Sequence, residues 1–380
     1  MADRSLDGLR VLMTAEAVGG ILTYALTLAA ELVRHGVTVH LATMGAPLRD
    51  GQRADAAIPG LVVHESVYAL EWMDNPWDDV SRAGDWLLEL ERVVAPDIVH
   101  LNGYSHAAIG FHAPVVVVGH SCVLSWWEAT HGERAPATFD RYRMEVSAGL
   151  AAAHAVVAPT RAMMECLEGH YGRPRFGVVI PNGVYAPTGA CAVAKERSVL
   201  AAGRLWDRAK NIDALARVAP RFAGPVRVAG VDQTPEEQRR PLPNVELLGW
   251  LDRHALERAM ESAAIFAHPA RYEPFGLAPL EAALRGCALV LGDIPSLREV
   301  WGDTAIYVDP DDDDALARAL ERYAEDDALR RDHADEAGAR ARMFTPRRMA
   351  TGTLDVYRRL VGLRAQSVPE RERGVNKSCA

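Results

Sequence analysis

Short apolar strands alternate with amphipathic helices along this chain, and the alternation occurs twice. Near the N-terminus, an apolar strand at 9–15 leads through a glycine turn into a helix at 21–36. Near the middle, a strand at 197–203 leads through a loop into a helix at 212–224. Strand–helix–strand units of this kind build parallel sheets, and strands that are apolar throughout are covered on both faces.

Each half of the chain continues this alternation. Further apolar strands are expected at 37–43, 97–103 and 114–120, and then at 226–230, 245–249, 264–269, 288–293 and 305–310. The sequence therefore predicts two doubly wound α/β domains that face each other across a cleft. Ligands of such sheets bind beyond the carboxyl ends of the strands, close to helix N-termini.

The two halves are joined by a segment at 178–198 that is rich in proline and glycine and has no helical period. A final helix is predicted beyond the second half, with Thr345 as its N-cap and Pro346 as its first residue. The polar end of the chain has no apolar period and is expected to be disordered. The predicted boundaries are 1–185 for the first domain, 186–345 for the second, 346–363 for the final helix and 364–380 for the tail.

Composition narrows the class of protein. A length of 380 residues suits two domains, and a net charge of −9 argues against nucleic-acid binding. The five cysteines contain no C-x-x-C pair, which is typical of a reduced intracellular protein. Neither a signal peptide nor an apolar run of about 20 residues is visible. We therefore expect a cytoplasmic protein, with at most a weak peripheral contact with the inner face of a membrane.

Two features suggest where an anionic ligand would bind. Arg204 and Lys210 lie in the loop that follows the strand at 197–203, where two cations suit a diphosphate. The Gly19–Gly20 turn lets the backbone approach a ligand and opens a helix whose N–H groups favour anions. Each signal is weak by itself, because surface loops commonly carry cations and strand-to-helix turns commonly need glycine.

The segment 271–286, RYEPFGLAPLEAALRG, carries a stronger signal. Pro274 favours an extended Glu273 ahead of a helix, and Phe275, Gly276 and Leu277 then present the free N–H groups of the helix start. Glu281 follows about one and a half turns later in an apolar setting, where a carboxylate needs a polar partner. Carboxylates accept hydrogen bonds from hydroxyls and amides receive oxyanions, so the segment suits a polyhydroxylated phosphate ester.

These motifs together resemble the retaining glycosyltransferases of family 4. The resemblance rests on E-P-F-G-L-x-x-x-E at 273–281, G-R-L followed by Lys210, I-P-N-G-V at 180–184, and an N-terminal G-G turn followed by a leucine-rich helix and R-H-G-V-T-V. It runs from about residue 8 to 362. It implies the GT-B fold, in which two Rossmann-like domains face across a cleft and a C-terminal helix returns to the first domain.

The resemblance also implies a role for each matching residue. Glu281 would hold the ribose of a nucleotide, and Glu273 would hold the donor sugar with the amides of Phe275, Gly276 and Leu277. Arg204 and Lys210 would neutralise the departing diphosphate, and Gly19 and Gly20 would approach phosphates or acceptor. His120, at the end of the strand 114–120, matches an active-site histidine beside the sugar, although a strand-end histidine is more often structural.

Two motifs are less clear. Where many family members carry Gly-Gly-x-x-E, this chain has GDIPSLREV; Glu299 fits the last position, but Asp293 and Pro295 replace small residues. Asn182 and Gly183 match the family's linker motif, and we expect a turn that needs positive φ there.

Family membership implies transfer with retention at the anomeric carbon, without a metal or other cofactor, because Arg204 and Lys210 supply the positive charge. The acidic run Asp311–Asp314 precedes a helix and is interpreted as a partner of the helix dipole rather than a metal site. The partners implied are a UDP- or GDP-type sugar donor and a sugar or small-molecule acceptor.

The acceptor is not identified by the sequence. Trp72, Trp77, Trp126 and Trp127 have polar surroundings that suggest loops, where they would stack on sugars or pack beneath the loops. Two other functions remain open: a GT-B nucleotide-sugar enzyme such as an epimerase, and a non-catalytic nucleotide-sugar binding protein. A dehydrogenase is disfavoured, because the first turn lacks G-x-G-x-x-G.

Overall fold

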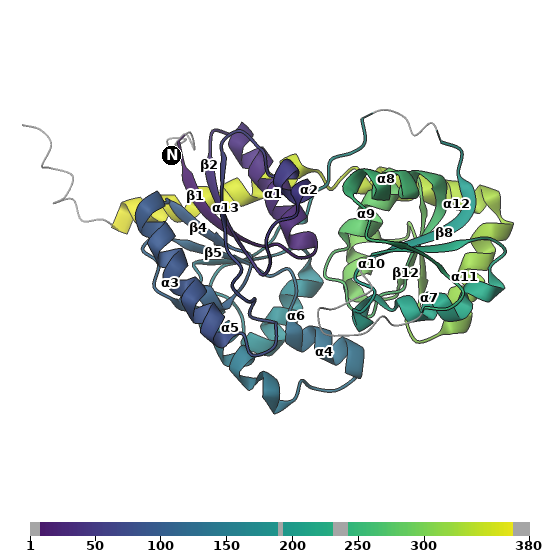
Figure 1. Cartoon of the computed structure of the whole chain (residues 1–380), viewed down its shortest axis with the longest axis horizontal. Coiled ribbons are helices and arrows are strands. Elements are labelled where there is room, and N and C mark those ends of the chain that lie inside the picture. Colours follow the sequence, from purple (N-terminus) through teal and green to yellow (C-terminus); the bar gives the residue numbers. More distant parts are fainter. Residues whose placement is uncertain (1–7, 189–192, 231–241, 368–380) are drawn as a thin grey trace, which may run out of the picture.

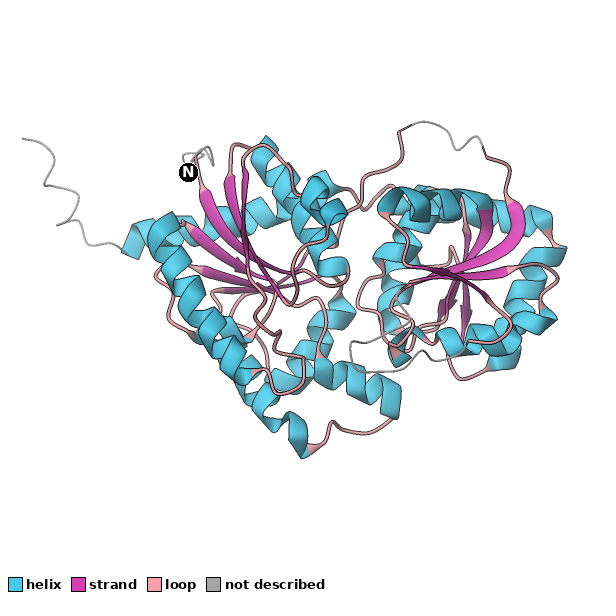
Figure 2. Cartoon of the chain, viewed as in Figure 1, coloured by secondary structure: helices cyan, strands magenta, loops and turns pink. Residues whose placement is uncertain are grey.

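Two parallel β-sheets, one in each half of the chain, form the framework of the computed structural model, which describes residues 8–188, 193–230 and 242–367. The first sheet has seven strands in the order β3-β2-β1-β4-β5-β6-β7, and the second has six in the order β10-β9-β8-β11-β12-β13. Helices cover both faces of each sheet (Figures 1 and 2). The prediction of two doubly wound domains is confirmed.

The first sheet and its helices occupy the first half of the chain. Its strands are β1 (Arg10–Glu16), β2 (Thr38–Met44), β3 (Leu61–Glu65), β4 (Ile98–Leu101), β5 (Val115–Val118), β6 (Ala155–Ala158) and β7 (Gly177–Val179). The helices around them are α1 (Gly20–Arg34), α2 (Asp50–Asp55), α3 (Trp77–Val94), α4 (Val123–His131), α5 (Asp140–Ala152) and α6 (Arg161–Tyr171), with the short 3-10 helices η1 (Ser105–Ala108) and η2 (Ala137–Phe139).

The second half repeats the plan. Its strands are β8 (Glu196–Ala202), β9 (Val226–Ala229), β10 (Glu246–Gly249), β11 (Ala263–His268), β12 (Ala288–Gly292) and β13 (Ile306–Val308). Its helices are η3 (Arg208–Lys210), α7 (Ile212–Val218), η4 (Ala219–Arg221), α8 (Arg253–Ser262), α9 (Leu277–Leu284), α10 (Pro295–Trp301), α11 (Asp313–Glu325), α12 (Asp327–Ala341) and the final α13 (Pro346–Ser367).

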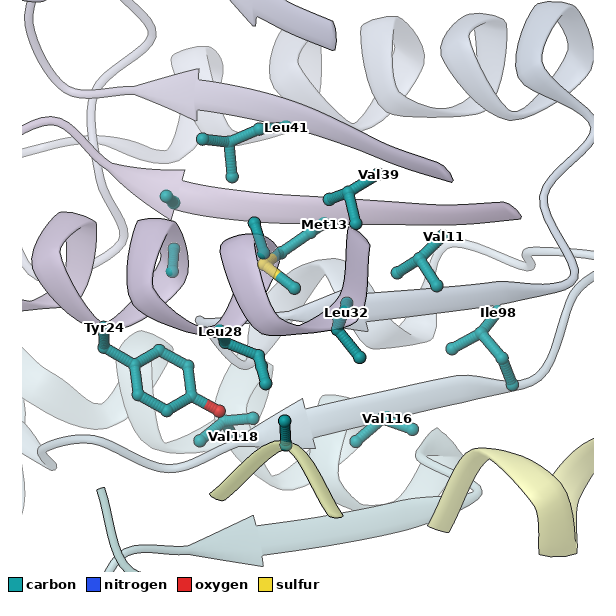
Figure 3. Packing of buried hydrophobic residues seen from close by; sticks show 14 of the residues in the cluster. Val11, Met13, Tyr24, Leu28, Leu32, Val39, Leu41, Ile98, Val116 and Val118 are labelled. Atoms are coloured by element: carbon teal, nitrogen blue, oxygen red, sulfur yellow. The ribbon is translucent and has the colours of Figure 1, made fainter. Parts of the chain in front are cut away.

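The apolar strands are explained by burial on both faces. Val11 and Met13 of β1 are fully buried in the cluster that includes α1, whereas Leu12 between them packs with Leu87 of α3 on the opposite face. Figure 3 shows the α1 side of this core, where Leu28 of α1 lies over the sheet. Successive strand residues point to opposite faces, so a strand with helices on both sides is apolar at most of its positions.

Helix α13 returns to the first domain (Figure 1). Arg348 N donates to Thr345 Oγ1 at 3.2 Å, which is the N-cap that the sequence predicts. Tyr357 is fully buried in the first domain, and its hydroxyl lies 2.6 Å from Nδ1 of His100. The helix was predicted to end at 363 but continues to Ser367. The rest of the predicted tail, 368–380, lies outside the described residues.

The link between the domains corrects one prediction. Neither Asn182 nor Gly183 has a positive φ, so the expected turn is absent at this pair. A Cβ on Gly183 would instead lie 2.4 Å from the carbonyl carbon of Thr345, because the two chain crossings between the domains run against each other. Val184 N also donates to Phe344 O at 3.1 Å. The glycine is required by this close approach of two backbones rather than by its own conformation.

The acidic run and the tryptophans also have structural outcomes. Asp312 caps α11 by accepting from Ala315 N at 2.8 Å, and the run forms ion pairs with Arg217, Arg221 and Arg271. The prediction that the tryptophans lie in loops is wrong for Trp77, Trp126 and Trp127, which belong to helices α3 and α4.

Candidate functional site

The predicted glycine turn lies directly against the second domain. Gly19 has φ 84° at the start of α1, a conformation that favours glycine. A Cβ at Gly19 would lie 3.5 Å from Nη1 of Arg204, and a Cβ at Gly20 would lie 3.4 Å from Cδ1 of Leu277. The carboxyl ends of the two sheets therefore meet here, and residues that the sequence assigned to opposite walls of a cleft are brought together.

Arg204 lies in the loop that follows β8, and its partner was not predicted from the sequence. Its Nη2 is 2.8 Å from Oδ2 of Asp207, while Asp207 Oδ1 accepts from Nε1 of Trp126 in the first domain at 2.9 Å. Burial opposes ionisation of Asp207, but the nearby Arg204 and Lys210 keep the pKa of its carboxyl below the usual range. The guanidinium is oriented by an ionised carboxylate, and the Arg204 side chain remains 39% exposed.

Lys210 and Glu273 form an ion pair with each other. Lys210 Nζ lies 2.6 Å from Oε2 of Glu273, and Nε2 of His268 lies 3.0 Å from the same oxygen. Although burial opposes its ionisation, the Lys210 ammonium and the His268 hydrogen bond hold the pKa of Glu273 well below its usual range. Glu273 is therefore a carboxylate, and Oε1 has no hydrogen bond to any residue in the described part of the chain.

The start of α9 presents backbone amides rather than side chains. Gly276 has φ 91°, and a Cβ there would crowd Glu273, Pro279 and Leu297 at 3.3–3.5 Å. Phe275 is buried and packs edge-on against Phe344 at 5.6 Å between ring centroids. Because the first amides of a helix have no intrahelical acceptor, Phe275, Gly276 and Leu277 can donate to an oxyanion.

Glu281 is the unusual carboxyl of the site. It lies within α9, and its side chain forms no hydrogen bond among the residues that the structure describes. Burial raises the pKa of Glu281 to about 7, against the opposing influence of Arg285 and Arg253. Arg285 forms its closest ion pair with Glu257, at 2.6 Å. Glu281 is half-buried, and a carboxyl that loses part of its water without gaining donors is costly, so the site suits a ligand that brings hydroxyl donors.

His120 follows β5 and is held by Asn102. Asn102 Nδ2 donates to Thr14 O at 2.6 Å, so Oδ1 is the atom that accepts from Nε2 of His120 at 2.8 Å. Burial lowers the pKa of His120 to about 3, and its ring lies edge-on to Tyr24 at 4.4 Å. The imidazole is neutral, with its proton on Nε2 and a lone pair on Nδ1.

Glu16 is a candidate residue that the sequence reasoning missed. It ends β1, three residues before the glycine turn, and its Oε1 accepts from Nε1 of Trp72 at 3.1 Å. Burial raises the pKa of Glu16 to about 8, the Glu71 carboxylate adds to this, and the Trp72 hydrogen bond and Arg204 oppose it. Its position at the carboxyl end of a strand, directly before a predicted ligand-binding turn, was the available signal.

A separate cavity of about 850 Å³ lies beside this site. It is lined by α4, α5 and α6 on one side and by Arg271, Tyr272, Pro274 and residues 294–296 on the other. Tyr272 separates it from the loop after β5, since its hydroxyl accepts from Cys122 N at 2.9 Å. None of the ten residues that the sequence assigned to the site lines it.

Within the described ranges, no group of three or more His, Cys, Asp or Glu side chains is placed to hold a metal ion. In the same ranges, no helix combines the length and apolar composition needed to cross a membrane.

Comparisons with known families agree with the two-domain division. The model described as Glycosyltransferase Family 4 matches residues 18–186, and the model described as Glycosyl transferases group 1 matches residues 196–326. The two matches together extend through most of both domains.

Three curated relatives are similar to parts or most of the chain. The O-antigen chain mannosyltransferase B of Escherichia coli is 32% identical over 30% of each chain. The phosphatidyl-myo-inositol mannosyltransferase of Mycolicibacterium smegmatis is 29% identical over 49% of this chain and 52% of its own length. The chain therefore spans about a third of the length of the first relative and about half of the length of the second. The alpha-maltose-1-phosphate synthase of M. smegmatis is 26% identical over 91% of this chain and 96% of its own.

Solved structures share the fold along nearly the whole chain. Sucrose-phosphate synthase from Thermosynechococcus elongatus superposes with a TM-score of 0.77 at 18% identity, covering 93% of this chain and 100% of its own. Anabaena HepE in complex with UDP and glucose gives 0.70 at 16% identity, covering 92% and 99%. These likenesses and the two parallel sheets confirm the GT-B fold.

Proposed function

Because the chain belongs to glycosyltransferase family 4, we propose that it transfers a sugar from a nucleoside-diphosphate donor to an acceptor hydroxyl, with retention of the anomeric configuration. The observation that carries the proposal is Glu281. Its carboxyl is half-buried and lacks a hydrogen-bond donor among the described residues, one and a half turns behind the free amides of α9. Ribose hydroxyls supply the missing donors while the amides receive a phosphate oxygen.

The remaining residues bind different parts of the donor. Glu273 presents Oε1 to hydroxyls of the sugar, and the α9 amides and the Gly19–Gly20 turn enclose the diphosphate. Arg204 and Lys210 are the cations nearest to it. Lys210 is paired with Glu273, so a bound diphosphate would share the Lys210 ammonium with the Glu273 carboxylate.

The same geometry supports a retaining reaction. The bond between the anomeric carbon and the diphosphate oxygen breaks first, and positive charge at Arg204 and Lys210 stabilises the negative charge that grows there. The acceptor oxygen attacks from the face that the diphosphate leaves, and its proton passes to the departing phosphate oxygen. His120 is neutral, and so acts as a hydrogen-bond partner of the sugar rather than as a cation. These cations take the place of a metal, so we expect full activity in excess EDTA.

The base of the nucleotide, the sugar and the acceptor are open within this proposal. UDP with glucose, present in the HepE structure, and the mannosyl transfer named in two relatives define the first donors to test. Trp72 and Glu16 offer an aromatic ring and a carboxyl on the first-domain side, which suits a sugar or polyol acceptor. We place the enzyme in the cytoplasm, with at most peripheral membrane contact.

Thermal-shift measurements with UDP, GDP and ADP test the proposal. A ligand that binds only the folded protein raises its melting temperature by mass action, so one of the three should stabilise the wild-type protein and stabilise Glu281→Gln less. The matching nucleotide sugar is then incubated with sugar acceptors. Epimerised donor without transfer would favour an epimerase, and tight binding without turnover would favour a binding protein. No stabilisation by any nucleotide would contradict the proposal.

A further inference from the structure

Helix α10 of the second domain meets the beginning of α6 in the first domain. Glu299 Oε1 accepts from Arg161 N at 2.7 Å, and Glu299 Oε2 accepts from Ala162 N at 2.9 Å. Arg161 and Ala162 are the first two residues of α6, whose first amides have no acceptor within the helix. Both oxygens of one carboxylate therefore satisfy a helix that belongs to the other domain.

The cap is completed by Thr160 of the first domain. Its Oγ1 accepts from Met163 N at 3.1 Å, so the third amide of α6 is satisfied within its own domain. The negative charge of Glu299 also lies at the positive end of the dipole of an 11-residue helix. Separating the domains would return two amides and a carboxylate to water and leave α6 only partly capped.

The residues around this contact are also hydrogen-bonded to the loop that carries Glu273. Thr160 Oγ1 donates to Pro274 O at 2.9 Å across the domain boundary. Ser296, one turn before Glu299 on α10, donates from Oγ to Glu273 O at 2.5 Å. The start of α6, helix α10 and the segment 273–274 are therefore connected to one another by hydrogen bonds.

We propose that Glu299 is a positioning residue for sugar transfer: by capping α6 across the domain boundary, it holds the two domains at the separation where Gly19 and Gly20 meet Arg204 and Leu277. The role for transfer rests on the proposed function, but the contact itself does not. Glu299 thus serves the arrangement of the two domains rather than the nucleotide. Interfaces between domains of one chain commonly permit relative motion, so a few strong contacts can set the equilibrium.

Two substitutions remove the contact from opposite sides. Glu299→Gln replaces one acceptor oxygen with a donor that faces an N–H group. Arg161→Pro removes the Arg161 N–H together with the exposed guanidinium side chain, and proline is well tolerated at the first position of a helix, here after an extended Thr160. Glu325→Gln, on the exposed end of α11, is the control for the change in net charge that Glu299→Gln brings.

Hydrogen–deuterium exchange of the full chain without ligand tests the proposal. Loss of a hydrogen bond to a charged group shifts an equilibrium by about tenfold or more. Both variants should therefore exchange at least about tenfold faster in peptides covering the α6 start, and also in peptides covering Gly19–Gly20 and residues 270–277, while Glu325→Gln matches the wild type. Faster exchange at the α6 start alone would make Glu299 a local cap and overturn the positioning role. Unchanged exchange at the α6 start would overturn the contact.

Circular dichroism and the melting temperature identify a variant that fails to fold, and Arg161→Pro then tests the proposal independently of Glu299→Gln. Calorimetry with UDP and with GDP adds a second measurement. The residues proposed to hold the nucleotide lie mainly in the second domain, so its affinity should stay within about threefold of the wild type while turnover falls about tenfold. A large loss of nucleotide affinity would place Glu299 in the binding site instead. Because exchange is read without substrate, failure of this inference is distinguishable from failure of the proposed function.

Discussion

Replacing Glu281 with glutamine should weaken nucleoside diphosphate binding strongly at about pH 8 and little at about pH 6. Burial raises the pKa of Glu281 to about 7, so the carboxyl is about nine-tenths ionised one pH unit above this value and about one-tenth ionised one unit below. If ribose hydroxyls donate to the carboxylate, as proposed, they favour the ionised form and lower the pKa of Glu281 in the complex. Binding therefore releases a proton, and the contribution of Glu281 is lost as the pH falls through about 7.

The magnitude follows from the strength of the contact. A hydrogen bond to a charged group contributes roughly 1.5–3 kcal/mol, which is about a tenfold or greater effect on affinity. At about pH 8 the variant should bind at least about tenfold more weakly than the wild type. At about pH 6 the wild-type carboxyl is mostly protonated and resembles the amide of glutamine, so the difference should fall to about twofold.

Isothermal titration calorimetry with UDP and GDP at both pH values measures this effect. The terminal phosphate of the nucleotide also titrates near neutral pH, but its contribution cancels in the ratio of wild-type to variant affinity at each pH. Glu325→Gln serves as the control for the change in net charge. An equal ratio at both pH values, or no loss of affinity at about pH 8, would refute the assignment of Glu281 to the ribose.

Three further predictions concern the same site. Glu273→Gln should leave nucleoside diphosphate affinity within about threefold of the wild type but cut turnover sharply, because its contacts strengthen as the sugar distorts; calorimetry beside steady-state rates would separate the two effects. Arg204→Ala and Lys210→Ala should each lower turnover by about two orders of magnitude with the fold intact. Near-native turnover in either variant would show that the diphosphate does not bind at that residue. The raised pKa of Glu281 adds stability that is fully present below its usual value of 4.5 and is lost as the pH rises through about 7. Glu281→Gln should therefore melt about 2 °C or more above the wild type at about pH 8 and close to it at about pH 5, and identical melting curves at both pH values would show that burial of the carboxyl is not costly.

The fold was predictable because strands that are buried on both faces of a sheet appear in the sequence as short, continuous apolar runs. Strands such as Val115–Val118 consist only of apolar residues, and the regular spacing of helices between them fixes a parallel arrangement. The final helix was predictable for a local reason, since Thr345 and Pro346 are typical of a helix start. The end of this helix was not predictable to the residue, because no helix stop signal lies between the expected end at 363 and Ser367.

The site was predictable where one segment carries the chemistry. Gly276 and Glu281 follow Glu273 within a single loop and helix, so their relative positions follow from helix geometry. The ion pair between Lys210 and Glu273 was not predictable, because the two residues are far apart in the sequence and meet only after β8 and β11 pair. No local pattern records which side chains meet across a sheet.

Contacts between the domains could not be predicted from the sequence for the same reason. Trp126 donates to Asp207, and Glu299 caps α6, only because the two sheets face each other with their carboxyl ends together. The turn expected at Asn182–Gly183 shows the opposite error. A glycine after asparagine suggests positive φ, but here a second backbone passes too close for a Cβ.

The central claim is tested most directly by following intact donors with purified protein. UDP-glucose and GDP-mannose, both α-linked, are incubated with a mixture of sugar and polyol acceptors, and ³¹P and ¹H NMR follow the diphosphate and the anomeric proton. The account predicts that one donor releases its nucleoside diphosphate while the first product formed has the α configuration, and that Glu273→Gln and Lys210→Ala largely abolish this release. A β product would contradict retention, and two intact donors with a protein that binds neither UDP nor GDP would contradict the proposed transfer.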